Sequence, residues 1–516
     1  MRGETGESAA PSAPARITPV QIVSLVLLLA IALGLRLYKI ETESVWFDEC
    51  VTYLALEKHL PPMEFFRAEA YYDPATVPVY FGSAYVWYNL GFTSIVGMRA
   101  LSIIAGMTTI VVMYAFGRRL FGHMGGMTVA LCMTAAKLQI YMSQEIRNYT
   151  FTLMFAAIAM YALQEAVSTN RRHWWVINVI ANGLLCLTHF VAGLLLFAQG
   201  VYLVVVHWRR YKTIAIWAAS HAPFLAFIPL WIKIVTSDNM EEQTNWIVWA
   251  GLDRAFRAYF FVFAGSLQDA MDFVRTLPIG IPVHYILGVL FMLAGAVFLI
   301  YCARNWRQHR DTAQGYTFSS VALLLVWLFV PPATLFIVAR LVRPIFIERY
   351  VLFSSLALFL ILGGAVASLP RKGLQYSAFG LLALVYAGNL VDYPRPLRHD
   401  FKSSCAILRT EFAPGDHLHT CLDYPEPPIG FYAGVPPEAI VSDADFPGVE
   451  SGDEDFAKRA VDEAQHGKRA WVWMFDVPKV WEHEKIEAHM TAGGVRFTKW
   501  EFNGRWHTFL YRLDPA

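Results

Sequence analysis

Long apolar runs separated by short polar stretches are the dominant pattern along this chain. Runs of about 17–25 residues are long enough to cross a bilayer as helices. They fall near residues 18–38, 99–118, 124–141, 148–166, 214–232, 282–302, 317–339, 347–369 and 373–391. The stretch 174–207 is about twice as long as one span and predicts two spans that meet near 187–190. The pattern therefore predicts about eleven transmembrane helices.

The basic loops predict the orientation of these spans. With the amino terminus inside, the stretches GRRLFGH, STNRRHW, HWRRYK, ARNWRQHR and PRK all fall in inner loops, as the positive-inside rule requires. A further apolar segment at 77–92 is short and rich in aromatic residues. Counting it as a span would place every one of those loops outside. We therefore interpret it as a helix that lies along the membrane surface.

This topology divides the chain into three parts. Residues 1–17 are predicted to be a disordered cytoplasmic tail, 18–397 a transmembrane domain, and 398–516 a small extracytoplasmic α/β domain. The transmembrane domain has two large outer loops, at 39–98 and 233–281.

The C-terminal part changes character, because helix-like and strand-like segments alternate in it. A helix followed by a strand is expected in 401–424 and again in 453–477. A helix at about 478–491 follows, and a hairpin turns at Asn503-Gly504. Cys405 and Cys421 also lie here, where an oxidising compartment permits a disulfide.

Composition supports this class of protein. The chain of 516 residues is 56% hydrophobic and only 16% charged, whereas soluble domains carry roughly 25% charged residues. These values indicate a multi-pass membrane protein, and we expect it in the plasma (inner) membrane. A net charge of +1 without a basic stripe argues against a nucleic-acid partner.

The first candidate chemistry is the pair Asp48 and Glu49, directly after the first span. Acidic residues are costly near hydrocarbon and are rare there unless they have a task. One interpretation is that Asp48 caps the helix that follows, since Asp is a favoured N-cap. The other is that Asp48 is a general base at the outer surface, with a pKa tuned by Glu49.

Two further groups lie at the outer ends of predicted spans. Glu145, Arg147 and Tyr149 form a polar cluster at the membrane surface; the alternative is an interfacial belt with a local ion pair. His189 lies where two spans meet, and a lone His there is more often a packing residue than a ligand.

Arg340, Arg343 and Arg349 share a short outer loop, which contradicts the charge bias of the inner loops. An arginine fork suits phosphate, although snorkelling to lipid headgroups is an alternative. An outer carboxylate base, a phosphate-binding arginine group and an exported domain suit transfer of a sugar from a lipid-phosphate carrier to an acceptor.

Six motifs in order carry a family resemblance. SVWFDE, the aromatic helix, MRALSIIAGMTTIVVMYAFGRRLFG, MSQEIRNYTF, LTHFVAG and ERYVLFSSLALFLILGG resemble the membrane glycosyltransferases of the C superfamily (GT-C). The most similar branch holds the protein O-mannosyltransferases, the lipid A aminoarabinose transferase and the rhizobial lipid A galacturonosyltransferases. The resemblance implies the GT-C membrane fold, a polyprenyl-phosphate sugar donor and inversion at the anomeric carbon.

The resemblance also implies roles for single residues. It makes Asp48 the base for the acceptor, beside Glu49, and it places Arg349 and Tyr350 near the lipid phosphate. The Gln-Glu-x-Arg segment, here Gln144, Glu145 and Arg147, shapes the site. Many relatives have His-Pro-Pro before the aromatic helix, where this chain reads DPATVPVY, so a role for that histidine does not carry over.

Several questions stay open at this stage. The acceptor is an envelope lipid, glycan or protein, and a divalent cation is an open alternative as cofactor. A transporter or flippase is the alternative function, but it predicts polar residues near mid-span rather than at one face. We expect Glu49 to hold the site together, for example by pairing with Arg147.

Overall fold

The computed structural model describes residues 18–72, 78–225, 318–391, 393, 398–421, 425–442, 455–475, 482–504 and 507–515, with isolated positions between 229 and 300. The tail 1–17 and most of the predicted outer loop 233–281 and of the predicted span 282–302 lie outside the described residues.

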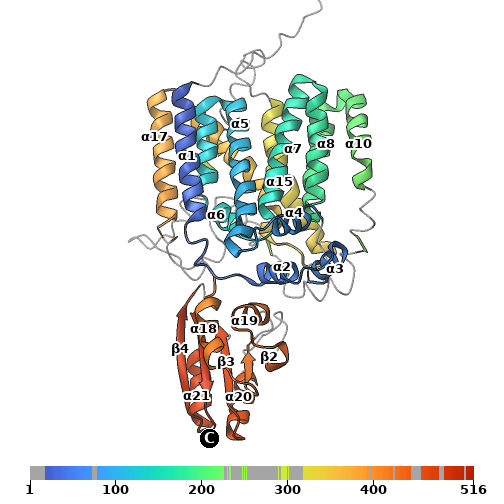
Figure 1. Cartoon of the computed structure of the whole chain (residues 1–516). Coiled ribbons are helices and arrows are strands. Elements are labelled where there is room, and N and C mark those ends of the chain that lie inside the picture. The colour runs from blue at the N-terminus through green and yellow to red at the C-terminus, as the bar shows by residue number, and fades with distance from the viewer. Residues whose placement is uncertain are drawn as a thin grey trace, which may run out of the picture.

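The first part of the chain is a helical bundle (Figure 1). Its elements are α1 (Pro19–Leu37), α5 (Ile95–Ala135), α6 (Lys137–Ser143), α7 (Tyr149–Thr169), α8 (Arg172–Cys186), η1 (Phe190–Ala192), α9 (Gly193–His207), η2 (Trp208–Arg210), α10 (Tyr211–Leu225), α15 (Phe318–Leu341), η5 (Glu348–Ser354), α16 (Ser355–Ala367) and α17 (Lys372–Asn389). Within the described residues, six helical stretches are long and apolar enough to cross a membrane.

The predicted fold class is confirmed, whereas the count of eleven spans is not established. Two of the six stretches are longer than one crossing: Ile95–Ala135 has 41 residues and Phe190–Phe224 has 35. The first breaks at Gly122, whose φ of 76° is readily adopted only by glycine. That break lies between the spans predicted at 99–118 and 124–141. The second contains α9 and α10, which the hydropathy pattern separates as two spans.

Three short helices of the first loop lie across one end of the bundle (Figure 1). They are α2 (Phe47–Glu57), α3 (Pro62–Tyr72) and α4 (Pro78–Asn89). The aromatic segment expected at 77–92 forms α4. Its buried Tyr80 ring lies edge-on to Phe151 of α7, with ring centroids 5.3 Å apart, and so anchors the first loop to the bundle.

The C-terminal domain is built on a five-stranded sheet with the order β2-β1-β3-β5-β4. Its strands are β1 (His417–Thr420), β2 (Ile440–Ser442), β3 (Ala470–Phe475), β4 (Phe497–Asn503) and β5 (His507–Leu513), and its helices are α18 (Phe401–Glu411), α19 (Glu426–Ala433), η6 (Pro437–Ala439), α20 (Asp455–Gln465) and α21 (His483–Ala492). Strand β1 is parallel to β2 and β3, and β5 is antiparallel to β3 and β4.

The central strand explains why this domain folds as a layered unit. Every residue of β3, AWVWMF, is buried, as expected of a strand covered on both faces. The predicted helix and strand order is present, while α19 and β2 were not predicted. Cys405 and Cys421 are free, buried thiols, so the structure does not contain the disulfide that the compartment would permit.

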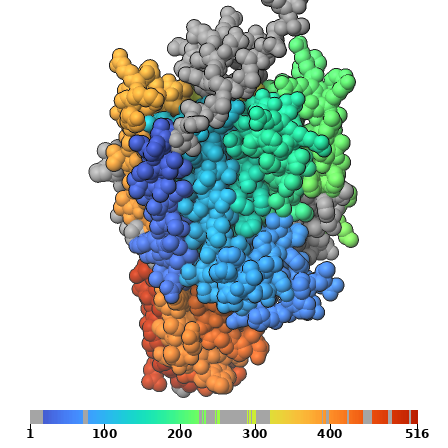
Figure 2. Space-filling view, turned by 45° about the horizontal axis from the view of Figure 1, so that its top comes forward, coloured from blue at the N-terminus to red at the C-terminus, as the bar shows by residue number. Residues whose placement is uncertain are grey.

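The C-terminal domain packs on the first loop (Figures 1 and 2). The Val45 amide donates to the hydroxyl of Tyr432 on α19 at 2.7 Å. The Lys402 amide at the start of α18 donates to the Ser44 hydroxyl at 3.2 Å. The Phe431 ring meets Tyr53 of α2 at a centroid distance of 5.5 Å. These contacts place the domain beside the acidic pair.

Candidate active site

The predicted site residues gather at the end of the bundle that carries the C-terminal domain. Asp48 and Glu49 lie on α2, Glu145 and Arg147 in the turn between α6 and α7, and Arg349 on η5. Figure 1 shows α2 and α6 toward that end. A transporter site is expected near mid-span, so this placement does not favour the transporter alternative.

Glu49, and not Asp48, serves the start of α2. The N-cap is Trp46, and Glu49 occupies the third helical position. Its carboxylate accepts the Trp46 amide at 3.2 Å, the reciprocal half of a capping box. The interpretation of Asp48 as the helix cap is therefore wrong, because α2 begins one residue before it.

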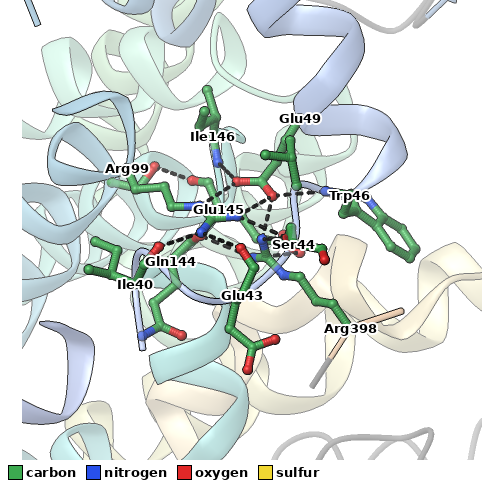
Figure 3. A network of polar contacts seen from close by, with 12 residues as sticks. Ile40, Glu43, Ser44, Trp46, Glu49, Arg99, Gln144, Glu145, Ile146 and Arg398 are labelled. Atoms are coloured by element: carbon green, nitrogen blue, oxygen red, sulfur yellow. Dashed lines mark hydrogen bonds and ion pairs between the residues drawn. The ribbon is translucent and has the colours of Figure 1, made fainter. Parts of the chain in front are cut away.

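Arg99 of α5 binds Glu49 as a two-pronged fork (Figure 3). Its Nε donates to Oε1 and its Nη2 to Oε2, both at 3.0 Å. The remaining N–H groups donate to the carbonyls of Ile40, Glu43 and Ser44 at 2.6, 3.2 and 3.1 Å. All five donors of a guanidinium are thus used, and both side chains are fully buried.

A second arginine reaches the same carboxylate from the C-terminal segment (Figure 3). Arg398 Nη1 donates to Glu49 Oε2 and, at 3.0 Å, to the Ser44 carbonyl, while Nη2 donates to the Gln144 carbonyl at 3.0 Å. The Ile146 amide completes the set at 3.0 Å from Glu49 Oε1. We call Glu49, Arg99, Arg398, Ser44 and Gln144 the Glu49 network.

The electrostatics of this network keep Glu49 ionised. Burial by itself raises the pKa of Glu49, but the charges of Arg398 and Arg99 and the Ile146 amide outweigh it, so the pKa lies below its ordinary value. A carboxylate held in this way is a poor proton acceptor. The expected pairing partner, Arg147, lies elsewhere, whereas Arg99 and Arg398 hold Glu49.

Gln144 and Arg36 fasten the turn between α6 and α7 to α1. The Gln144 amide donates to the carbonyls of Arg36 and Tyr38 at 2.9 and 2.8 Å. The buried Arg36 guanidinium donates to the Ser143 hydroxyl at 3.1 Å and to the Met133 carbonyl at 3.0 Å. The turn that carries Glu145 and Arg147 is therefore rigidly placed.

Asp48 occupies a different environment from its neighbour. Its side chain is 24% exposed, and Arg147 Nε lies 3.8 Å from Oδ2, beyond ordinary hydrogen-bond distance. The Arg147 guanidinium lies over the ring of Phe81 on α4, 5.7 Å from its centroid. Asp48 is thus partly accessible to solvent and also lies near a cation, whereas Glu49 is fully buried.

Glu145, in the turn between α6 and α7, is a third carboxyl of the site, and it is buried. Arg398 Nη2 lies 3.8 Å from its Oε1. Burial raises the pKa of Glu145 to about 7; the charges of Arg398 and Arg349 oppose this effect, and those of Glu49 and Asp48 add to it. This group therefore changes protonation near neutral pH.

Arg349 and His189 each contact a tyrosine ring. The Arg349 guanidinium lies over the Tyr149 ring, 5.8 Å from its centroid. Buried His189 has its ring 5.0 Å from that of Tyr350. Burial, followed by the charges of Arg147 and Arg349, lowers the pKa of His189 to about 3, so its imidazole is neutral.

We call Asp48, Arg147, Tyr149, His189 and Arg349 the Asp48 face. It contains most of the residues that the sequence predicted to bind the donor. Arg343 follows the end of α15 and is half-buried, and Arg340 is exposed on the last turn of that helix.

Sequence reasoning missed Arg99 and Arg398. Both carried the signal that singled out Arg349, because each is an arginine on the predicted outer side. Arg99 was counted as the first residue of a span, and Arg398 as the start of the exported domain. Neither position indicates that its side chain turns back to Glu49.

Comparisons with known proteins bear on the same regions. Residues 78–232 match the family model described as dolichyl-phosphate-mannose-protein mannosyltransferase. A comparison with curated protein sequences finds no match. The solved structure of the Archaeoglobus fulgidus oligosaccharyltransferase with Zn and sulfate is 12% identical, with 88% of this chain and 68% of that chain covered and a TM-score of 0.53.

Two further structures show weaker likeness. ArnT from Cupriavidus metallidurans bound to undecaprenyl phosphate is 13% identical, with 96% and 98% of the two chains covered and a TM-score of 0.40. The S. cerevisiae Pmt1–Pmt2 protein O-mannosyltransferase complex bound to the sugar donor is 18% identical, with 50% and 39% covered and a TM-score of 0.33.

The matched segment 78–232 contains Arg99, Glu145, Arg147 and His189, whereas Asp48 and Arg349 lie outside it. The archaeal structure, with a TM-score above 0.5, shows the shared fold. At 12% identity this likeness concerns the fold, and it agrees with the membrane fold that the six motifs predicted. The family match covers residues 78–232, less than half of the chain.

Proposed function

We propose that the protein transfers a monosaccharide from a polyprenyl-phosphate donor to an acceptor hydroxyl at the outer face of the membrane. The contrast between two adjacent carboxylates carries this proposal. Glu49 is buried under two guanidinium groups, whereas Asp48 is 24% exposed and lies 3.8 Å from Arg147. Asp48 can therefore meet an acceptor, and Glu49 cannot.

The proposed step uses Asp48 as general base. The acceptor oxygen attacks the anomeric carbon, a new carbon–oxygen bond forms, and the bond to the phosphate oxygen breaks. The hydroxyl proton passes to Asp48, and the electron pair of the broken bond stays on the polyprenyl phosphate. A positioned general base typically contributes 10²–10⁴-fold to such a rate.

Cations of the Asp48 face would receive the phosphate. Arg349 and Arg147 come from η5 and from the turn before α7, so they approach from two elements. An arginine fork matches phosphate geometry and stabilises the charge that develops on the leaving group. The name of the matched family, which specifies dolichyl phosphate mannose, supports a polyprenyl-type carrier.

The proposal does not include a divalent cation, because the part of the chain that the structure describes offers no set of ligands for one. Among the described residues, no group of three or more His, Cys, Asp or Glu side chains is placed to hold a metal ion. The Glu49 oxygens already accept from two arginines and two backbone amides.

Transfer by the purified protein tests the proposal. Lipid and glycan profiles of cells with and without the gene would identify the acceptor class. Purified wild-type protein should then move sugar from a polyprenyl-phosphate donor to that acceptor, and Asp48→Asn should do so about 10²–10⁴-fold more slowly. Sugar transfer that needs a nucleotide sugar and ignores the lipid donor would refute the proposal.

The outer location of the site has its own test. A reporter active only outside the cytoplasm should be active when fused after residue 391 and silent after residue 211. A silent reporter at 391 would place Asp48 on the inner face and exclude an outer-face transferase.

A further inference from the structure

We propose that the C-terminal domain completes the active site by supplying Arg398, a positioning residue that joins Glu49 to the turn carrying Glu145 and Arg147. The inference rests on the proposed function of this site. Its consequence is that a docked C-terminal domain is a condition for catalysis and not only an appendage.

Arg398 contacts three separate segments of the transmembrane domain. Its guanidinium donates to the Ser44 carbonyl before α2, to the Glu49 carboxylate on α2 and to the Gln144 carbonyl in the turn after α6. It also lies over the Tyr141 ring, 5.2 Å from its centroid. The side chain is only 3% exposed, so these contacts form in a dry environment where they are strong.

Arg99 cannot replace it. The five N–H groups of Arg99 all donate to Glu49 or to carbonyls of the segment 40–44. These bonds hold α2 to α5. Arg398 is the cation that bridges from Glu49 to the Gln144 carbonyl. Without it, the Ile146 amide keeps the Glu49 carboxylate tied to the turn, but the charge-assisted link is lost.

The fold of the C-terminal domain fixes the backbone on which Arg398 stands. Asp400 caps α18, accepting the Ser403 amide at 2.9 Å. The His399 ring packs on Phe475 of β3 with centroids 4.1 Å apart. Domain folding therefore determines where residue 398 lies, and docking through Val45 and Tyr432 determines where its side chain points.

A close approach by Gly504 adds a second, independent constraint. Gly504 follows β4, and a Cβ there would lie 2.8 Å from the Asp400 nitrogen and 3.0 Å from the Arg398 carbonyl oxygen. Both are backbone atoms, so a side chain at 504 would push the 398–400 segment aside. The Gly504 site thus offers a way to displace Arg398 without changing its chemistry.

Two variants test the proposal, each with a matched control in the same domain. Arg398→Gln removes the charge, with Arg496→Gln at an exposed position as its control. Gly504→Ala displaces the segment, with Gly430→Ala as its control, because the nearest atom to a Cβ there is 3.8 Å away. Transfer rates and amide hydrogen exchange of residues 143–149 are measured in full-length protein.

We expect both test variants to lower the transfer rate about 10- to 100-fold, the scale of a lost orienting contact, and to speed exchange in 143–149. Arg398→Lys should recover part of the rate, since it keeps the charge. In Arg398→Gln the acidic limb of the rate profile should move to higher pH. Glu49 and Glu145 lose a cation there, while Arg99, Arg349 and Asp48 remain around them.

Two results would overturn the inference. One is a rate and pH profile for Arg398→Gln equal to those of Arg496→Gln. The other is unchanged exchange in 143–149 for both test variants. The exchange measurement needs no substrate, so it decides the positioning role even if wild-type protein transfers no sugar and the proposed function fails.

Discussion

The Glu49 network and the Asp48 face begin one residue apart and are built in opposite ways. In the network, the Glu49 carboxylate accepts from two guanidinium groups and two backbone amides. On the face, Asp48 has Arg147 at 3.8 Å and a side chain that is 24% exposed. One carboxylate is saturated by the protein, and the other keeps oxygen lone pairs for a substrate.

This contrast explains how the dipeptide Asp48-Glu49 can have two separate roles. Consecutive residues of a helix are about 100° apart around its axis, so α2 leaves Asp48 partly exposed and turns the next carboxylate, Glu49, inward. A buried charge must be paired to be tolerated, and the network pairs it. The two adjacent acids thus have different roles in the proposal: Glu49 supports the structure of the site, and Asp48 is the reactive group.

The comparison predicts its largest effect at Asp48. Asp48→Asn should lower turnover by about 10²–10⁴-fold with donor binding and thermal stability nearly unchanged, because the amide cannot accept the proton. Glu57→Gln, exposed on the same helix, is the control. A variant with near wild-type turnover would show that the accessible carboxylate is not the base.

A comparably large effect, on stability rather than on rate alone, is expected at Glu49. Glu49→Gln leaves two buried arginines without their counter-charge, and breaking a buried pair typically costs about 3–5 kcal/mol. The free energy of unfolding in detergent, or the yield of folded protein, measures this loss. Loss of rate with full stability would mean that Glu49, too, acts on the substrate.

A smaller effect on donor affinity separates the arginines. Arg349→Ala should weaken binding of the polyprenyl-phosphate donor by roughly 1.5–3 kcal/mol, the range of hydrogen bonds to charged groups. Arg343→Ala should weaken it less, because Arg343 is half-buried beyond α15 and Arg349 lies against Tyr149. Equal losses of donor affinity in the two variants would indicate that Arg343 also binds the phosphate, as the sequence alone suggested.

The smallest effect is a pH dependence from Glu145. Its pKa is about 7 in the folded protein, so the folded state binds this proton more tightly than the unfolded state. The resulting stabilisation is complete below pH 4.5 and is lost as the pH rises through 7. Wild-type protein should lose about 1–3 kcal/mol of stability across that window relative to Glu145→Gln.

Thermal unfolding of both proteins from pH 4.5 to 8.5 measures this difference. Parallel curves would contradict a buried Glu145 carboxyl that titrates near neutrality. The Glu49 carboxylate does not add to this window, because its pKa is lowered. Its stabilisation is lost only as the pH falls below its ordinary titration range.

Part of the candidate site could be predicted from the amino-acid sequence. Asp48, Glu145 and Arg349 are charged residues at the ends of apolar runs, and ionised groups at such places are costly unless they have a task. Their sequence motifs also resemble those of a known family, so the sequence predicts that they act together. Their separation into a network and a face was not readable, because adjacent residues in a motif carry no record of which side chain is buried.

The fold class, the aromatic helix α4 and the helix–strand order of the C-terminal part could all be predicted from the amino-acid sequence. Hydrophobic periodicity and loop charge are local properties that a single chain displays directly. The partners of Glu49, in contrast, could not be predicted without the folded structure. Arg99 and Arg398 lie 50 and 349 residues from it along the chain. Which buried charges meet is set by how the bundle and the domain pack, since each buried ion must find an opposite charge within hydrogen-bond reach.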